Sequence, residues 1–219
     1  MIPSYEEWQN ALIERQGKER QNKISQATVA VCGLGGLGSN ISICLARAGV
    51  KKLILIDFDK VDITNLHRQQ YKADQIGIPK AQALSSNLKE IAPYVQLEPH
   101  PERITPENAG ELLSSVDVIC EAFDVAENKA MLTNYVLEHF PDKFYVSSSG
   151  MAGFDTANTI QTRKITDRFY LCGDGVSDVN HGIGLVSSRV MTCAAHEAHV
   201  VLRYLTGELN ESSDNESEG

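Results

Sequence analysis

The chain has 219 residues, a hydrophobic content of 42% and a formal net charge of −9. This length and apolar content suffice for one α/β domain with a sizeable core, and the negative charge argues against broad nucleic-acid binding, which relies on clustered Lys and Arg. No stretch approaches the ~18 apolar residues of a membrane span, the start lacks the regions of a signal peptide, and the five scattered cysteines argue against a disulfide framework. We therefore expect a soluble protein of the reducing cytoplasm.

Residues 5–25 have the pattern of a polar helix, with Trp8, Leu12 and Ile24 as its apolar contacts. The segment also carries Arg15 and Arg20. A solvated helix face would explain both cations, so the residues by themselves leave their role open.

A glycine-rich turn follows the first predicted strand, residues 27–32, and precedes a helical pattern over residues 39–47. Without a Cβ atom, Gly33 can take a tight turn, Gly35 lets backbone N–H groups approach an anion, and Gly38 lets helix and strand pack closely. The helix N-terminus then presents free N–H donors and a positive dipole end. A plain βα turn is the alternative, but the flanking strand and helix favour a nucleotide-phosphate site.

A second buried strand, residues 52–57, ends in the carboxylate of Asp57, about 20 residues beyond Gly38. In a dinucleotide-type fold, a carboxylate at this position accepts hydrogen bonds from ribose hydroxyls. A solvated acid at the strand end is the alternative interpretation.

Residues 57–70 concentrate polar side chains without strand or helix periodicity. Loops at the carboxyl ends of parallel strands are where such folds place function. Asp59 could bind Mg²⁺ through water, Asn65 could orient a phosphate or hydroxyl, and Arg68 could offer a planar fork to phosphate oxygens. Each of these side chains could also be an ordinary turn residue.

Lys80 comes directly before the helical pattern of residues 81–92, and Pro79 suits the first turn of that helix. The helix dipole disfavours a cation at its N-terminus. A bound polyphosphate would resolve this conflict.

Further strand and helix patterns alternate along the rest of the chain. We expect strands at residues 95–98, 116–124, 143–149, 158–162 and 168–172, and helices at residues 105–113, 126–139 and 184–204. Asp124 at the end of a central strand would share one crevice with Asp57. The predicted fold is α/β: a Rossmann-like, mostly parallel sheet with helices on both faces and a C-terminal antiparallel extension. We expect one domain at residues 1–207 and an acidic, disordered tail at residues 208–219.

Zinc is not expected. The sequence has no C-x-x-C pair. Cys193, His196 and His199 do not converge on one ion, because at about 100° per residue the first and last point about 120° apart on a helix.

Several of these motifs occur together in one known family. The stretches Gly33-Leu-Gly-Gly-Leu-Gly38, Asp57-Phe-Asp59 and Asn65-Leu-His-Arg-Gln69, with the Lys80 helix start and Asp124, resemble the ThiF/MoeB/HesA family, the bacterial relatives of ubiquitin-activating enzymes. The Asn-Leu-x-Arg-Gln element is far more specific than the glycine loop. The chain is most similar to the short ThiF-like branch without zinc-binding cysteine pairs. The resemblance implies ATP and Mg²⁺ as cofactors and adenylation of the C-terminal glycine carboxylate of a small ubiquitin-like sulfur carrier.

The resemblance also implies roles for individual residues. Asp57 would hold the ribose, Arg68 and Lys80 would neutralise the polyphosphate, and Asp124 would position Mg²⁺ with support from Asp59. Further nucleotide contacts would come from Gly33, Gly35, Gly36, Gly38, Asn65 and Gln69.

The pair Arg15-Gln16 resembles the Arg-Gln pair with which family members send an arginine into the neighbouring subunit's site. Arg15 therefore implies a homodimer. The segment between Arg15 and Gly33 is shorter than in MoeB, which makes Arg20 the substitute candidate.

The implied chemistry brings a carboxylate to an α-phosphate, so catalysis must consist of in-line positioning and cationic neutralisation. Adenylation needs no protein nucleophile. Some relatives form a persulfide or thioester on a cysteine afterwards, and Cys172 is the candidate here because it lies outside an evident core strand or helix. Inert packing of this cysteine is the alternative.

The main hypothesis is adenylation of a ThiS-like carrier in thiamine thiazole biosynthesis. A molybdopterin-type carrier and the carboxylate of tRNA threonylcarbamoyladenosine are alternative substrates, and the acidic body and short length weigh against tRNA. An NAD(P)-dependent dehydrogenase would use the glycine loop and Asp57 equally well, but it leaves Asp59, Arg68, Lys80 and Asp124 unexplained. A non-catalytic scaffold would have little reason to keep these polar groups.

Overall fold

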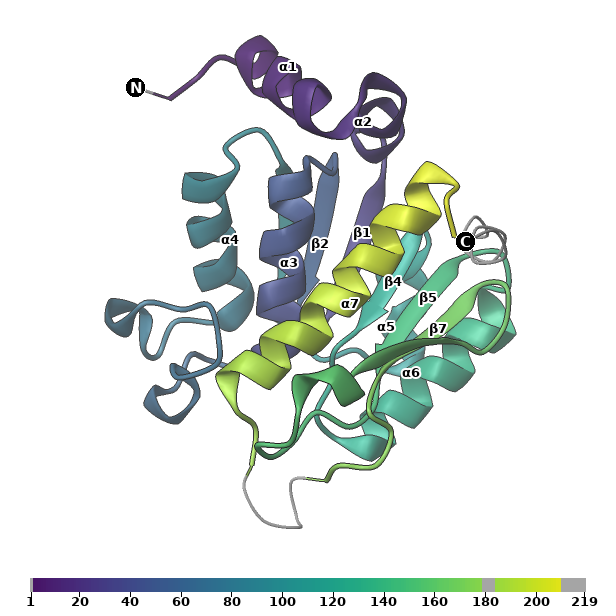
Figure 1. Ribbon diagram of the computed structural model, residues 1–219. Helices are drawn as coiled ribbons and strands as arrows, with labels where there is room; N and C mark the ends of the chain where they lie inside the picture. Colours follow the sequence, from purple (N-terminus) through teal and green to yellow (C-terminus); the bar gives the residue numbers. More distant parts are fainter. Residues whose placement is uncertain (1, 179–183, 210–219) are drawn as a thin grey trace.

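Within residues 2–178 and 184–209, the part of the chain that the computed structural model describes, seven strands form one sheet (Figure 1). The strands lie in the order β3-β2-β1-β4-β5-β7-β6. Their bounds are β1 Thr28–Cys32, β2 Lys52–Ile56, β3 Gln96–His100, β4 Val118–Glu121, β5 Phe144–Ser148, β6 Gln161–Lys164 and β7 Phe169–Gly173.

Helices connect the strands. Their bounds are α1 Tyr5–Gln16, α2 Lys18–Ile24, α3 Gly36–Ala48, α4 Lys80–Ile91, α5 Pro106–Leu113, α6 Ala126–His139 and α7 Ser187–Thr206, with short 3₁₀ turns at Ile63–Asn65, Ala73–Gln75 and Ala157–Thr159. Among the described residues, none of these helices is both long and apolar enough to cross a bilayer.

The sheet is parallel from β3 to β7, and only the edge strand β6 runs antiparallel, against β7. From β1 the chain proceeds to β2 and β3 on one side, and later to β4, β5 and β7 on the other. The topology therefore has a switch point between β1 and β4. In open α/β sheets this is where the loops at the carboxyl ends of the strands separate and leave a crevice for a ligand.

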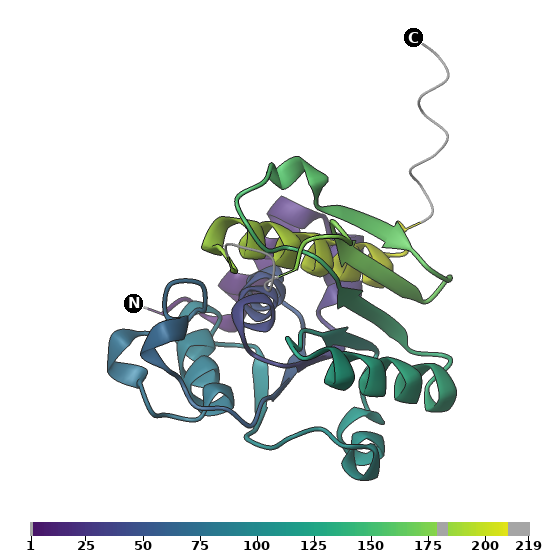
Figure 2. The same ribbon diagram turned by 90° about the horizontal axis from the view of Figure 1, so that it is seen from below.

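Two hydrophobic cores cover the two faces of the sheet. Successive residues of β1 alternate between them, Val29 and Val31 on one side and Ala30 and Cys32 on the other, as the pleat requires. The first core packs under α3, α4 and α7, and the second under α5 and α6, so the sheet lies between two helical layers (Figures 1 and 2). The central strands β1, β2, β4 and β5 are almost entirely buried, which explains their mostly apolar sequences.

The expected fold class is confirmed. The expected N-terminal helix is instead two helices, because Gly17 has φ +84° and ends α1. The glycine-rich helix begins three residues earlier than expected, at Gly36. The predicted C-terminal extension is also smaller, since β7 joins the sheet parallel to β5 and only β6 is antiparallel.

The chain after α7 continues to pack on the domain for a few residues. Glu208 accepts a hydrogen bond from Arg20 Nε at 2.5 Å, and Leu209 packs against the first core. The first two residues of the predicted tail therefore contact the rest of the chain, and the bounds of the tail stay a prediction. Its remaining residues, 210–219, lie outside the described residues.

Candidate functional site

A cavity of about 710 Å³ opens at the carboxyl ends of the strands, the end of the molecule that faces the viewer in Figure 2. Its volume is in the range of small-ligand sites. One side, which we call the β1–β2 wall, is formed by residues 33, 35–37, 56–59, 65, 68, 69 and 80. The opposite side, the β5–β7 wall, is formed by residues 148–152 and 175–178. Residues 122–126, 128 and 129, from the turn after β4 and the first part of α6, lie between the two. This is the crevice expected at the switch point.

The glycine turn of the β1–β2 wall is shaped by close backbone approaches. Gly33 has φ +90°, and a Cβ atom there would lie 2.8 Å from the carbonyl oxygen of Ala122. A Cβ atom on Gly38 would lie 1.8 Å from the carbonyl oxygen of Gly33, which no rearrangement of side chains could relieve. At Gly35 the nearest atom would be Gln69 Nε2, at 3.8 Å, so an anion can approach the start of α3 from this side.

Asp57, Asp59 and Lys80 form a half-buried ionic cluster on the same wall. Asp57 accepts hydrogen bonds from the Leu34 N–H to Oδ2 at 2.6 Å and from the Asp59 N–H to Oδ1 at 2.8 Å. Lys80 Nζ lies 2.8 Å from Asp59 Oδ2 and 4.0 Å from Asp57 Oδ2. Burial raises the pKa of Asp57, and the charge of Lys80 opposes this rise. The cation at the start of α4 is thus already balanced by two carboxylates, where the sequence suggested a polyphosphate.

Arg68 and Gln69 leave hydrogen-bonding atoms without partners at the cavity. Arg68 Nη2 donates to Asn65 Oδ1 at 3.0 Å, but within the described residues neither Arg68 Nε nor Gln69 Oε1 has a partner, and both atoms are buried. Burial lowers the pKa of Arg68, and the nearby charge of Asp124 opposes this change. Both residues line the cavity, and buried polar atoms without partners are rare enough in folded proteins to mark a candidate binding site.

Asp59 and Asp124 are the predicted magnesium carboxylates, and both line the cavity. In the described part of the chain, no group of three or more His, Cys, Asp or Glu residues could hold a metal ion. The two carboxylates of Asp59 and Asp124 suit Mg²⁺, because this ion keeps several waters and is bound by one or two carboxylates together with substrate phosphates.

Glu121 and Lys129 belong to the site although the sequence analysis did not select them. Glu121 ends β4 with no exposed surface, and its carboxylate accepts hydrogen bonds from the Phe123 N–H at 2.6 Å and from Lys129 Nζ at 2.9 and 2.8 Å. Lys129 lines the cavity from α6. The sequence does carry a signal for Glu121, since it is a single acidic residue at the end of an apolar strand. Burying a carboxylate is costly unless it is paired, so a cationic partner was to be expected.

Glu197 of α7 and Ser148 of β5 are also buried near the cavity. Neither carboxylate oxygen of Glu197 nor the hydroxyl of Ser148 makes a hydrogen bond of normal geometry within the described residues. Burial raises the pKa of Glu197 well above its ordinary value, with Lys129 acting in the opposite direction. Burial therefore favours the neutral form of this carboxyl group.

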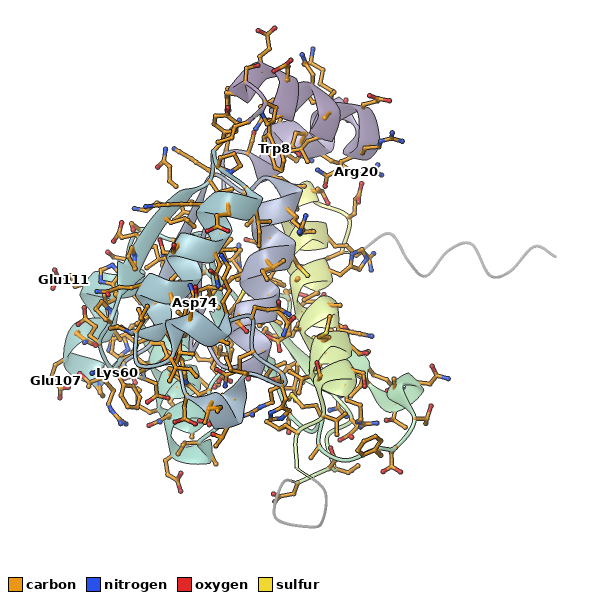
Figure 3. All side chains as sticks on the ribbon, turned by 90° about the vertical axis from the view of Figure 1, so that its left-hand side faces the viewer. Trp8, Arg20, Lys60, Asp74, Glu107 and Glu111 are labelled. Atoms are coloured by element: carbon orange, nitrogen blue, oxygen red, sulfur yellow. The ribbon has the colours of Figure 1, made fainter. Side chains whose placement is uncertain are left out.

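The structure does not bring the two N-terminal arginines to the cavity of their own chain. Arg15 ends α1 on the exposed surface, and Arg20 of α2 pairs with Glu208. Both helices lie at the opposite end of the sheet (Figure 1). In Figure 3, Arg20 is accordingly far from Lys60, which belongs to the loop after β2. A role in a neighbouring subunit stays a prediction.

Cys172 does not line the cavity either. It lies inside β7 with no exposed surface, so the premise that it lies outside a core strand is wrong. Burial, and next the charge of Glu197, raises the pKa of Cys172 to about 12. A thiol in this environment is not a ready nucleophile, and its proposed reaction stays a prediction.

Known proteins resemble this chain in sequence. A model of the ThiF family matches residues 8–217. A sulfur carrier protein adenylyltransferase of Thermus thermophilus is 37% identical over 114 residues, 52% of this chain and 42% of that protein. Ubiquitin-like modifier-activating enzyme 5 of Caenorhabditis elegans is 45% identical over 94 residues, 42% of this chain and 22% of that protein. The matched segments thus span less than half the length of these relatives.

Solved structures share the fold at low sequence identity. The tRNA N6-threonylcarbamoyladenosine dehydratase TcdA of E. coli in complex with ATP has a TM-score of 0.84 at 20% identity, covering 97% of this chain and 100% of that chain. E. coli MccB has a TM-score of 0.70 at 18% identity, covering 87% of this chain and 59% of that chain.

Proposed function

The chain belongs to the ThiF family, and from this premise we propose that it is an ATP-dependent adenylyltransferase. Its substrate would be the C-terminal glycine carboxylate of a ThiS-like ubiquitin-like sulfur carrier in thiamine thiazole biosynthesis, and pyrophosphate would leave. The observation that carries the proposal is the β1–β2 wall. There an open glycine turn, Arg68 with an unpartnered Nε, and Lys80 lie around one cavity.

The reaction brings one anion to another. A carboxylate oxygen attacks the α-phosphorus of ATP in line with the leaving pyrophosphate, so the barrier falls when cations and N–H donors neutralise the phosphates. The start of α3 and Arg68 can donate to phosphate oxygens. Lys80 can exchange part of its interaction with Asp59 for a phosphate, because the Asp59 side chain is about half exposed and can turn to water or a metal ion. No protein nucleophile is needed for this step.

A bound Mg²⁺ would supply positive charge that offsets the negative charge of the phosphates. We propose that Asp124 holds it and that Asp59 supports it. Asp57 would accept hydrogen bonds from the ribose hydroxyls, since each of its oxygens takes only one backbone N–H and retains acceptor capacity. Zinc is not part of the proposal.

The remaining parts of the hypothesis concern partners. We propose a homodimer in which Arg15, or Arg20 in its place, reaches the cavity of the neighbouring subunit, and we propose that the protein works in the cytoplasm. The position of α1 and α2 at the end of the sheet away from their own cavity supports an intersubunit role, because from there neither arginine can reach that cavity (Figure 1). Arg20 would have to leave its ion pair with Glu208 to do so.

A different carboxylate substrate is the second candidate. The structural likeness to TcdA extends over the whole of that chain. The carboxylate of a tRNA threonylcarbamoyladenosine is therefore one alternative substrate. A molybdopterin-type carrier is another. The net charge of −9 opposes tRNA binding. An NAD(P)-dependent dehydrogenase would leave the Lys80 cluster without a purpose.

ATP–pyrophosphate exchange tests the proposal. Labelled pyrophosphate is supplied with Mg·ATP and a ThiS-like carrier, and the control is the same carrier without its terminal glycine. Exchange with the intact carrier alone would support the proposal. If Mg·ATP binds in calorimetry but no carrier gives exchange, the carrier proposal fails and filter binding to tRNA comes next. A shift in melting temperature with NAD but not with Mg·ATP would instead support the dehydrogenase.

A further inference from the structure

A buried ion pair lies behind the β5–β7 wall without lining the cavity. Arg189 of α7 and Asp174, which follows β7, have side chains that are 3% and 6% exposed. Arg189 Nη2 donates to Asp174 Oδ2 at 2.6 Å. Neither residue is among those that face the cavity, so the pair acts on the site only through what it holds in place.

The arginine ties α7 to the loop after β5. Its Nη1 donates to the carbonyl oxygens of Asp155 at 2.6 Å and Thr156 at 2.7 Å. Two nitrogens of one planar fork thus bind a carboxylate and two backbone carbonyls in different segments. A lysine offers one flexible ammonium and cannot reproduce this arrangement.

The aspartate fixes the wall itself. Asp174 Oδ1 accepts hydrogen bonds from the N–H groups of Val176 at 2.9 Å and Ser177 at 2.8 Å. The Ser177 hydroxyl in turn accepts one from the Ala152 N–H at 2.9 Å. The contact with Gly150 is so close that a Cβ atom there would lie 2.1 Å from Asp174 Oδ1. Backbone bonds from the Asp174 N–H to the Gly150 carbonyl and from the Gly175 N–H to the Ser149 carbonyl, both 2.9 Å, also join the two segments of the β5–β7 wall. The carboxylate of Asp174 fixes the second segment and ties it to α7 through Arg189.

The pair is a poor device for stability alone. Burying two charges carries a large desolvation penalty, and apolar residues of similar volume often stabilise a core as well or better. Within the described residues, Arg189 Nε also lacks a partner. The directional hydrogen bonds of the pair do fix the backbone of the β5–β7 wall in one position relative to α7.

We propose that Arg189 and Asp174 are positioning residues that hold the β5–β7 wall in place for the carboxylate substrate. This inference rests on the proposed adenylation. If the β1–β2 wall binds the phosphates, the nucleophile must approach the α-phosphorus on the side away from the leaving pyrophosphate. The β5–β7 wall lies across the cavity and is therefore the surface along which the carboxylate substrate enters.

The test compares Arg189→Met, Arg189→Lys and Asp174→Asn with the wild-type chain. We expect kcat/KM for the carboxylate substrate in the exchange reaction to fall roughly 100-fold in Arg189→Met, the scale of a displacement of about 1 Å at a reacting group. The dissociation constant of Mg·ATP, measured by calorimetry, should change less than about threefold, because the substitution leaves the nucleotide contacts of the β1–β2 wall in place. Arg189→Lys should recover part of the loss.

Arg168→Met is the matched control, because Arg168 also donates to a backbone carbonyl, that of Asp142 at 2.6 Å, but at the opposite end of β7. Its kinetic constants should equal those of the wild type. Ser177→Ala is the milder variant should the arginine variants not fold. It removes the bond to the Ala152 N–H and keeps the ion pair of Arg189 with Asp174, and it should raise KM for the carboxylate substrate and leave Mg·ATP binding unchanged.

Amide hydrogen exchange on the free protein separates this inference from the proposed function. Arg189→Lys should speed exchange at residues 152, 176 and 177 and leave the glycine turn at residues 33–38 as protected as before. Unchanged exchange at the wall would overturn the inference, as would equal losses of Mg·ATP and carboxylate binding. If the wild-type chain shows no pyrophosphate exchange with any carboxylate, the proposed function fails, and the hydrogen-exchange result still decides whether the pair holds the wall.

Discussion

The β1–β2 wall presents its charged groups to the cavity, whereas the β5–β7 wall keeps its ion pair behind the surface. Arg68, Lys80 and Asp59 line the cavity themselves. Arg189 and Asp174 reach it only through the backbone of residues 152, 176 and 177. The difference shows two uses of charge in one site: direct neutralisation of a ligand, and placement of the backbone that forms the facing wall. Changes in the first wall should alter chemistry, and changes in the second should alter the recognition of one substrate.

The largest expected effect is on the β1–β2 wall. Arg68→Ala should lower the rate of pyrophosphate exchange by about 10²–10³-fold, the loss typical for one preorganised donor to a charged transition state. Asp124→Ala should have a comparable effect, through Mg²⁺. Arg47→Ala is the control, because Arg47 is an exposed arginine at the other end of α3. Full exchange activity in Arg68→Ala would show that Arg68 does not neutralise the phosphates during the reaction.

The second prediction concerns stability. Lys80→Met should lower the free energy of unfolding by about 3 kcal/mol, because it leaves the carboxylate of Asp57 buried without its cation. Asp59→Asn should cost about 1 kcal/mol or less, since that side chain is about half exposed. Urea unfolding measures both, with the exposed Lys60→Met as the control. Equal losses in Lys80→Met and Lys60→Met would show that the cluster has no structural role.

A third prediction addresses the neutral carboxyl group near the β5–β7 wall. Because burial raises the pKa of Glu197 in the folded state, the folded chain binds more protons than the unfolded chain at pH values above about 4.5. The stability that this proton uptake contributes is present below that pH and is lost as pH rises toward the folded-state pKa.

Glu197→Gln has no proton to take up and should lose less stability than the wild type between pH 5 and pH 8. Urea unfolding at the two pH values gives the comparison. A parallel decline in both proteins would show that the carboxyl group ionises normally.

The smallest effect is expected at Cys172. Cys172→Ala should leave pyrophosphate exchange within about twofold of the wild type, because adenylation needs no protein nucleophile. Since burial raises the pKa of this thiol to about 12, about one molecule in ten thousand would carry the thiolate at pH 8, and alkylation by iodoacetamide should be slow. Rapid labelling at Cys172 in the folded protein would revive its role in a later sulfur-transfer step.

The elements whose signals are local could be predicted from sequence. The glycine turn, the acid after β2 and the lysine at the start of α4 occupy positions that a strand and a helix define by themselves. The start of α3 at Gly36 could not be predicted, because glycine is a poor helix former and the helix begins there for tertiary reasons. The direction of β7 was equally hidden, since a pattern of alternating residues does not specify the neighbouring strand.

The contacts that complete the site join residues distant in sequence. The pairing of Lys80 with Asp59 depends on how the loop between them folds, and the approach of Glu197 to Ser148 depends on where α7 crosses the sheet. Asp174 and Arg189 look like an ordinary loop acid and an ordinary helix cation in the sequence. The two side chains become buried only when α7, the loop after β5 and the segment after β7 pack together. Local sequence patterns contain no information about that packing.

The two edges of the sheet have a consequence for self-association. At the β3 edge, the N–H of Gln96 bonds inward to the Lys51 carbonyl, so by alternation the missing N–H of Pro99 falls on the outer side. The β6 edge is polar and carries Arg163 and Lys164. Neither edge offers a good template for an added strand, and charged or proline-bearing edges of this kind protect sheets from fibrous aggregation. A stable dimer of this chain would therefore be expected to pair through helices and loops and not by joining the two sheets at their edges.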